Sequence, residues 1–166
     1  MSEDTWASVQ KFLSREAMLL DQKDWESWLE LYRPNCKYWV PAWRDDGTLV
    51  EDTDKEISLI YYNSRIGLEG RVYRVRKGHP SSYSSLARTC HFNQLQYAEW
   101  LSGSDEKVLK VRSNWSTYST VENSESHYFG YAEYDLVEGE NGWKILNKKT
   151  IVMNDMIHEV LDFYHI

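Results

Sequence analysis

The chain has 166 residues, of which 42% are hydrophobic and 27% charged, and this size and composition predict one compact globular domain over residues 1–166. Its formal net charge of -7 argues against a nucleic-acid-binding protein, because such proteins need an extended basic surface and the longest basic run here is confined to residues 71–77. No apolar run approaches the roughly 20 residues that span a bilayer, and Glu3 and Asp4 stand where a secretory signal would be basic, so we expect a cytoplasmic protein without membrane contact.

Two helices are predicted ahead of the first strand. Apolar residues recur every three or four positions from Trp6 to Leu20, which indicates an amphipathic helix. Asp24 is placed to cap a second helix. Pro34 is expected to end that helix, because the residue before a proline avoids the helical region. The two helices should form a short hairpin.

The segment CKYWVPAW, residues 36–43, predicts a strand that is apolar on both faces. Pro41 cannot donate a hydrogen bond to a neighbouring strand, so we expect an edge or a bulge there. RDDG then predicts a turn, and EISLIYY, residues 56–62, a second strand. Two cysteines, Cys36 and Cys90, are too few for a disulfide framework, and each is expected to act as a small buried apolar residue.

A third helix is predicted after Asn63, which can cap it. Its basic residues gather late, where they suit the helix dipole, and Gly78 suits its exit. Gly67 and Gly70 each cost about 1 kcal/mol inside a helix. We therefore expect another backbone to approach the helix closely at these two positions.

The second half of the chain predicts an antiparallel meander. Strands are expected near residues 87–101, 107–121, 126–138 and 142–153, separated by the turn segments SGSDE, ENSES and GENG. Helices gathered in the first half and strands in the second favour an α+β domain whose helices cover one face of the sheet.

The C-terminal segment resembles a metal site in its spacing. Its acidic and histidine residues are Asp155, His158, Glu159, Asp162 and His165. A mononuclear iron site needs two histidines and a carboxylate, but the position expected for the second imidazole is occupied by Phe163. The same pattern also fits the solvated face of a helix. A strand with a bulge is another interpretation that the sequence allows. We therefore predict no metal ligands in this segment.

Two other kinds of site can be tested on the sequence. A Rieske cluster needs two cysteines and two histidines, and the neighbouring Cys90 and His91 would point to opposite faces of a strand. We therefore predict neither metal nor cofactor ligands in the chain. A further group of polar residues allows two interpretations. They could form an acid–base site in an enclosed pocket, or they could be ordinary polar residues that are hydrogen-bonded in the core or exposed on the surface. The residues concerned are His91, His127, Tyr128, Tyr131, Glu133 and Asp135.

Three long stretches carry a resemblance to a known family: FLSREAMLLDQKDWESWLELYRPNCKYWVPAW, EISLIYYNSRIGLEGRVYRV and VLDFYHI. Together they resemble the beta, or small, subunit of bacterial aromatic ring-hydroxylating dioxygenases, within the branch that acts on benzoate, toluate and anthranilate. The resemblance runs from Phe12 to Ile166.

The resemblance implies an NTF2-like, or cystatin-like, cone, with N-terminal helices packed in the concave face of a strongly curved, mostly antiparallel sheet. It also implies a hetero-oligomer, commonly α3β3, with contacts between beta subunits. The alpha subunit would carry the Rieske 2Fe-2S cluster and the mononuclear Fe(II), and a reductase would supply electrons from NADH. The complex would convert an arene and dioxygen into a cis-dihydrodiol in aromatic compound catabolism.

We therefore expect a structural, non-catalytic subunit that stabilises the alpha subunits. Large rings beyond the needs of a core can stabilise an interface, and the pattern of the sequence favours five interface residues: Trp39, Trp43, Tyr61, Tyr62 and Arg65. Two alternatives remain. One is a stand-alone isomerase or dehydratase of the same fold, which would use a His, Asp and Tyr set in its cavity, and the other is a small-molecule binding protein.

Overall fold

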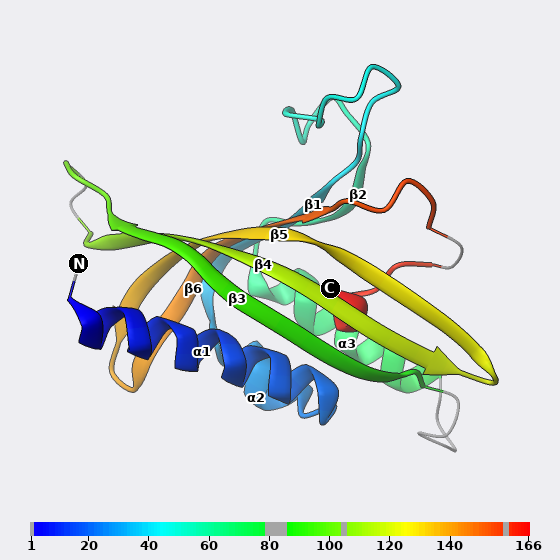
Figure 1. Ribbon diagram of the computed structural model, residues 1–166, viewed down its shortest axis with the longest axis horizontal. Helices are drawn as coiled ribbons and strands as arrows, with labels where there is room; N and C mark the ends of the chain where they lie inside the picture. Colours follow the sequence, from blue (N-terminus) through cyan, green and yellow to red (C-terminus); the bar gives the residue numbers. More distant parts are fainter. Residues whose placement is uncertain (1, 79–85, 104–105, 158–159) are drawn as a thin grey trace.

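The computed structural model describes residues 2–78, 86–103, 106–157 and 160–166, which form one long curved sheet with helices against one face (Figure 1). Among these residues, no helix is long and apolar enough to cross a membrane. In chain order the elements are α1 (Glu3–Asp21), α2 (Trp25–Leu29), β1 (Tyr32–Pro41), β2 (Ser58–Tyr62), α3 (Arg65–Gly78), β3 (Arg88–Trp100), β4 (Val108–Val121), β5 (Ser124–Gly139), β6 (Gly142–Val152) and the 3-10 helix η2 (Phe163–His165).

The six strands lie in the order β2-β1-β6-β5-β4-β3. Strands β3 to β6 form the predicted antiparallel meander. The first two strands pair with each other in antiparallel fashion, and β1 then joins the meander by pairing in parallel with β6. This parallel pairing adds β1 and β2 to the meander and makes one six-stranded sheet, and the sequence did not predict it.

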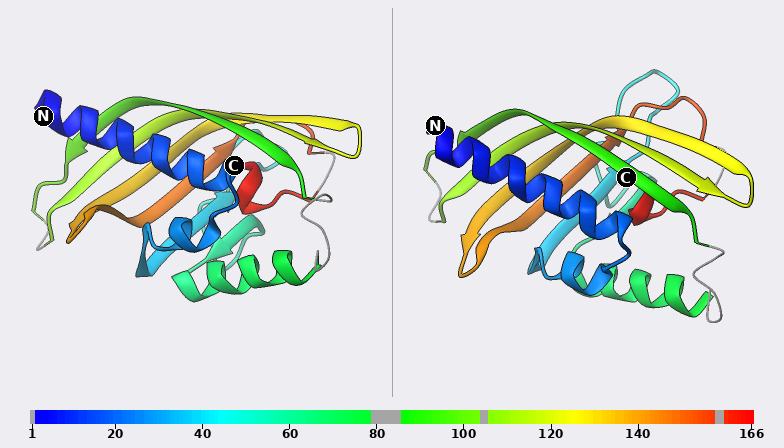
Figure 2. Two further views of the ribbon diagram at one scale, coloured as in Figure 1. Left: turned by 90° about the horizontal axis from the view of Figure 1, so that it is seen from below. Right: turned by 60° about the horizontal axis from the view of Figure 1, so that its bottom comes forward.

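The helices lie on the concave side of the sheet, as Figure 2 shows. α1 runs along β3, which is an edge strand. Side chains of α1 accept hydrogen bonds from backbone amides of β3 at that edge. Gln10 Oε1 accepts from the Leu95 amide at 2.9 Å, and Asp21 Oδ2 accepts from the His91 amide at 3.1 Å. Because an unpaired edge invites pairing with other chains, α1 both fills the cone and covers this edge.

Aromatic rings fill the part of the cone beneath α2. Trp28 stacks on Phe163 with ring centroids 4.9 Å apart, and it meets Tyr32 edge-on at 5.0 Å. Trp25 meets Phe163 edge-on at 5.5 Å. All four rings are almost fully buried. These four rings are therefore core residues.

The second helix ends earlier than predicted. Asp24 caps it as expected, with its side chain accepting from the Ser27 amide at 3.3 Å, but the helix stops at Leu29. Pro34 lies inside β1 instead of ending the helix. The pairing of β1 with β6 shifts register between Tyr32 and Lys37, so the proline occupies an irregular stretch where its missing donor is tolerated.

Three local expectations can be compared with the structure. Pro41 does lie at a register shift of the β1–β2 pair. Among the described residues, the atoms nearest to a Cβ on Gly67 belong to the Tyr62 side chain, at 2.5 Å, and a Cβ on Gly70 would find nothing closer than 3.9 Å, so a side chain and not a second backbone lies nearest to these glycines. Cys36 is buried as expected, but Cys90 is exposed, because it lies on the outer face of the edge strand.

The C-terminal segment is neither the helix nor the strand that the sequence left open. It is a docked tail that ends in η2, with Phe163 and His165 buried inside the cone. Arg71 of α3 anchors it, because its guanidinium binds both carboxylate oxygens of Asp162, with the shortest distance 2.6 Å. The segment GHPSSYSS, residues 78–85, is expected from the sequence to be a loop, and its residues 79–85 lie outside the described residues.

Candidate functional site

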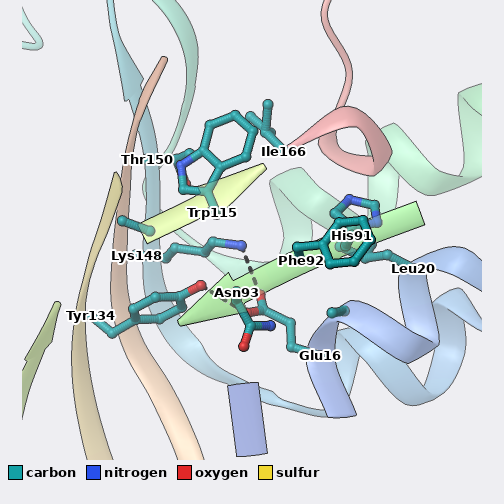
Figure 3. Close-up of a pocket in the computed structure, with 12 residues that line it drawn as sticks. Glu16, Leu20, His91, Phe92, Asn93, Trp115, Tyr134, Lys148, Thr150 and Ile166 are labelled. Atoms are coloured by element: carbon teal, nitrogen blue, oxygen red, sulfur yellow. Dashed lines mark hydrogen bonds and ion pairs between the residues drawn. The ribbon is translucent and has the colours of Figure 1, made fainter. Parts of the chain in front are cut away.

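A buried ion pair lies at the centre of the cone (Figure 3). Glu16 comes from the inner face of α1 and Lys148 from the inner face of β6, and their charged atoms are 2.9 Å apart. Both side chains are only 4% exposed. The carboxylate also accepts from the hydroxyls of Tyr32 at 2.8 Å and Tyr134 at 2.9 Å. The pair is thus part of a four-residue polar network in the interior of the cone.

This network controls the ionisation of its members. Burial by itself raises the pKa of Glu16, but the Lys148 ammonium and the hydrogen bonds from Lys148, Tyr32 and Tyr134 outweigh it, so the pKa lies below its ordinary value of 4.5. Burial, together with the nearby Glu16 charge, raises the pKa values of Tyr32 and Tyr134 well above 10.0. Near neutral pH, Glu16 is therefore a carboxylate and both tyrosines are donors.

A small cavity adjoins the network. Its volume is about 30 Å³, and its polar lining comes from α1, β3, β4, β5 and β6. Pockets that bind substrates or drug-sized ligands commonly measure roughly 300–1,000 Å³. An aromatic ring therefore does not fit in this cavity. The residues that line it are Glu16, Ala17, Leu20, His91, Phe92, Asn93, Trp115, Ala132, Tyr134, Lys148, Thr150 and Ile166.

His91 and Asp21 form a second polar pair beside the cavity. His91 Nδ1 lies 2.6 Å from Asp21 Oδ1, and the histidine side chain is 7% exposed. Thr89 donates to the same oxygen at 2.9 Å. Burial raises the pKa of Asp21, but the hydrogen bonds from His91 and Thr89 outweigh this, and the net direction is downward. Asp21 is therefore an ionised acceptor that orients the imidazole.

The polar residues singled out in the sequence do not converge on one site. His91 lines the cavity, and Tyr128 is buried inside the cone, with its ring centroid 5.7 Å from that of His165. On β5 the buried residues alternate with the exposed or half-buried ones, so the other four candidates face outward. These four are His127, Tyr131, Glu133 and Asp135.

Sequence reasoning missed the residues at the centre of the cone. Glu16 had a detectable signal, because it falls within the apolar stripe of the first predicted helix and therefore faces the core. A charged residue on such a stripe requires a partner. The identity of that partner, Lys148, was not detectable, because the two residues are 132 positions apart.

No group of three or more potential metal ligands occurs among residues 2–78, 86–103, 106–157 and 160–166. Two residues of the C-terminal pattern, His158 and Glu159, lie outside the described residues. Asp162 is held by Arg71, and His165 Nδ1 accepts from the Asp162 amide at 3.1 Å. These two side chains have structural partners within the docked tail.

The five predicted interface residues fall into two groups. Trp39 and Tyr61 are paired across β1 and β2 on the outer face, and Trp43 follows in the loop beyond β1 with 42% of its surface exposed. Tyr62 lies on the inner side, where its ring packs against Gly67. Arg65 begins α3 and binds Glu69 at 2.9 Å. Trp39 and Tyr61 share the outer face, and Trp43 is exposed beyond the end of β1, where its indole nitrogen donates to the Val152 carbonyl at 2.7 Å.

Comparison with known sequences gives long matches. Residues 15–159 match the family described as ring hydroxylating beta subunit. The chain is 41% identical to the 2-halobenzoate 1,2-dioxygenase small subunit of Burkholderia cepacia, covering 99% of this chain and 98% of that protein. It is 34% identical to the anthranilate 1,2-dioxygenase small subunit of Acinetobacter baylyi, with both covered completely.

Comparison with solved structures agrees with these sequence matches. The beta subunit of benzoate 1,2-dioxygenase from Burkholderia mallei superposes with a TM-score of 0.77 at 38% identity, covering 96% of each chain. A putative scytalone dehydratase from Novosphingobium aromaticivorans shares the fold alone, with a TM-score of 0.65 at 12% identity over 95% of this chain and 91% of that one. The cone that the resemblance implied is therefore confirmed.

Proposed function

The chain belongs to the family of ring hydroxylating beta subunits, and from that membership we propose that it supports an iron-bearing alpha subunit in the oxidation of an aromatic carboxylic acid. It is the small, non-catalytic subunit of an aromatic ring-hydroxylating dioxygenase of the benzoate, toluate and anthranilate type. Beta subunits of such multi-subunit dioxygenases pair with alpha subunits. We propose in addition the stoichiometry of the complex and the chemical class of its substrate.

In the proposed complex, three alpha and three beta subunits assemble in the cytoplasm, and the beta subunits also contact one another. The alpha subunits hold the Rieske cluster and the mononuclear iron, and a reductase delivers electrons from NADH. Relatives named for 2-halobenzoate, toluate, benzoate and anthranilate support an aromatic carboxylate as the substrate. The product is a cis-dihydrodiol of that acid.

The filled interior of the cone is the observation that carries the structural role. The space that could hold a substrate is occupied by the Glu16–Lys148 network and by the ring cluster around Trp28. The cavity beside the network measures about 30 Å³. A stand-alone isomerase, a dehydratase or a small-molecule binding protein needs room for its ligand, so this interior favours neither alternative.

The outer face at the β1–β2 end is the proposed docking surface for the alpha subunit. Trp39, Tyr61 and Trp43 lie there, and Leu59, on the same face of β2 as Tyr61, is 42% exposed. Lys149 lies over the Trp39 ring at 4.7 Å, which places a cation among the aromatic groups. Exposed aromatic and aliphatic groups beside a cation are typical of an interface core with a polar rim.

Tyr62 and Arg65 contribute differently to the proposed surface. Tyr62 lies on the inner side of β2, so it supports the surface from beneath. Arg65 donates to the Tyr32 carbonyl at 3.2 Å and fixes the start of α3 against β1. Both residues therefore position the docking surface, whereas Trp39, Trp43 and Tyr61 would touch the alpha subunit.

Co-expression with the alpha subunit encoded beside this chain tests the proposal. Size-exclusion chromatography with light scattering should give a mixed hexamer, and iron should be bound only when alpha is present. Trp43→Ala should weaken this assembly. Trp6→Ala is the matched control, because Trp6 has a similar exposure, 38%, but lies on α1. Equal assembly of the two variants would remove Trp43 from the interface, and iron in the isolated chain would contradict the structural role.

A further inference from the structure

The two edges of the sheet differ in how their backbone groups are satisfied. The strand order leaves β3 at one edge and β2 at the other. At the β3 edge, side chains of α1 accept hydrogen bonds from the amides of His91 and Leu95. At the other edge, β2 pairs with β1 alone, and no other hydrogen bond reaches its backbone from the part of the chain that the structure describes. Free N–H and C=O groups along an edge strand pair readily with another chain, so proteins usually cover such an edge.

A groove runs beside the uncovered edge of β2. Residues 59–62 of β2 line one side of it, and Arg71 and residues 160–163 of the C-terminal tail line the other. Its volume is about 270 Å³, which is below the roughly 300–1,000 Å³ of pockets that bind small molecules. Both walls carry exposed aliphatic side chains, because Leu59 is 42% and Val160 79% exposed. Apolar walls beside free backbone groups suit an extended polypeptide, whose main chain pairs with the edge and whose side chains enter the groove.

The loop that leads into β2 is strongly acidic. Residues 44–56 contain six acidic and two basic residues, and the loop projects beyond β1 and β2 (Figure 1). Arg44 is paired with Glu56 and Lys55 with Asp52. The other four carboxylates have no ion pair within the described ranges: they are Asp45, Asp46, Glu51 and Asp54. A partner segment with lysine or arginine beside its apolar residues complements this charge, whereas a second copy of the chain brings the same acidic loop.

We propose that an extended segment of the alpha subunit pairs with β2 and adds a seventh strand to the sheet. Its apolar side chains contact Leu59 and Val160, and its basic residues lie beside the loop of residues 44–56. This inference rests on the proposed function and specifies it further, since docking of side chains on the outer face requires no main-chain pairing. Pairing between the β2 strands of two copies has two-fold symmetry, which a three-fold complex does not supply.

An electron cryo-microscopy structure of the co-expressed complex is the direct test. We expect a strand of the alpha subunit with main-chain hydrogen bonds to residues 58–62. A complex in which this edge is bare, or is covered by a second copy of the chain, would overturn this inference and leave the proposed function standing. If no complex forms with the alpha subunit, both are wrong.

Hydrogen–deuterium exchange tests the main-chain pairing in solution. Amides of residues 58–62 should exchange at least tenfold more slowly in the complex than in the isolated chain, because a paired edge amide is protected. The amides of His91 and Leu95 are the internal control, since α1 already holds them in the isolated chain. Equal slowing at both edges, or no slowing at β2, would contradict the pairing.

Val160→Lys places a charge in the groove without touching the aromatic residues of the outer face. Ile66→Lys is the matched control, because Ile66 is 75% exposed and lies on α3 outside the groove. Both variants should fold, since both side chains are mostly exposed. Mass photometry on dilution should show that Val160→Lys raises the half-dissociation concentration of the complex at least tenfold and Ile66→Lys less than twofold. Equal values for the two variants would remove the groove from the interface.

Discussion

Replacing Lys148 by methionine removes the cation from the buried ion pair and leaves the Glu16 carboxylate without a compensating charge. Both side chains are 4% exposed, so solvent cannot take over the role of the ammonium. Removing one partner of a buried pair costs about 3–5 kcal/mol. Tyr32 and Tyr134 still donate to the carboxylate, which favours the lower end of this range. For a chain of this size, about 3 kcal/mol lowers the melting temperature by roughly 6–12 °C.

The pH dependence of the same variant identifies the buried charge as the cause. In the native chain the pKa of Glu16 is below 4.5, so its contribution to the free energy of unfolding is complete above the unfolded pKa and is lost as pH falls through the folded pKa. In Lys148→Met, burial without a cation raises the folded pKa above the unfolded one. The variant is then most stable at low pH and loses stability as pH rises through that raised pKa.

Urea unfolding followed by tryptophan fluorescence at pH 7.5 and pH 4.5 measures this effect. The difference in unfolding free energy between native chain and variant should shrink at the lower pH. The double variant Glu16→Gln/Lys148→Met is the control, because no buried charge remains and it should recover much of the loss at pH 7.5. A loss that is equal at both pH values, or a double variant no more stable than the single one, would refute the reasoning.

Three further predictions concern packing, the docked tail and the thiols. Gly130→Ala places a Cβ 1.9 Å from a backbone oxygen of β6, so urea unfolding should show a loss of about 3 kcal/mol or more, and a loss below 1 kcal/mol would contradict this. Asp162→Asn weakens the bond to Arg71, and we expect a loss of about 1.5–3 kcal/mol, with faster proteolysis at the C-terminal tail than in the native chain. Burial raises the pKa of the Cys36 thiol to about 11, whereas Cys90 is exposed, so iodoacetamide at pH 8 should modify only Cys90 by mass spectrometry.

Features of the fold that depend on neighbouring residues were predictable. Asp24 caps α2 because a carboxylate three residues ahead of a free amide needs no distant partner. The meander strands were also predictable, because alternation and turn residues act within each hairpin. Pro34 shows the limit of this reasoning. We expected this proline to end the second helix, but the helix ends at Leu29 and Pro34 lies within β1, which pairs with β6.

Identification of the interior site required contacts between distant parts of the chain. His91 was named in advance as a candidate, but its partner Asp21 is 70 positions away, and no spacing rule connects the two. Conversely, His127 looked equivalent to His91 in the sequence, yet it stacks on Tyr118 on the outer face with ring centroids 4.4 Å apart. The face of the sheet on which a strand residue lies depends on register, and register depends on the partner strand.

The sequence by itself determined the helices, the strands, the family and the expectation that the chain is a structural subunit, because these depend on local propensity or on long stretches of similar residues. Only the tertiary structure decided that the cone is filled, that Glu16 and Lys148 meet inside it, and that Trp39 and Trp43 face outward while Trp25 and Trp28 face inward. The physical reason is that burial and charge pairing are properties of the space between strands and helices. That space exists only once the parallel pairing of β1 with β6 joins the first two strands to the meander, with the helices packed on the concave side.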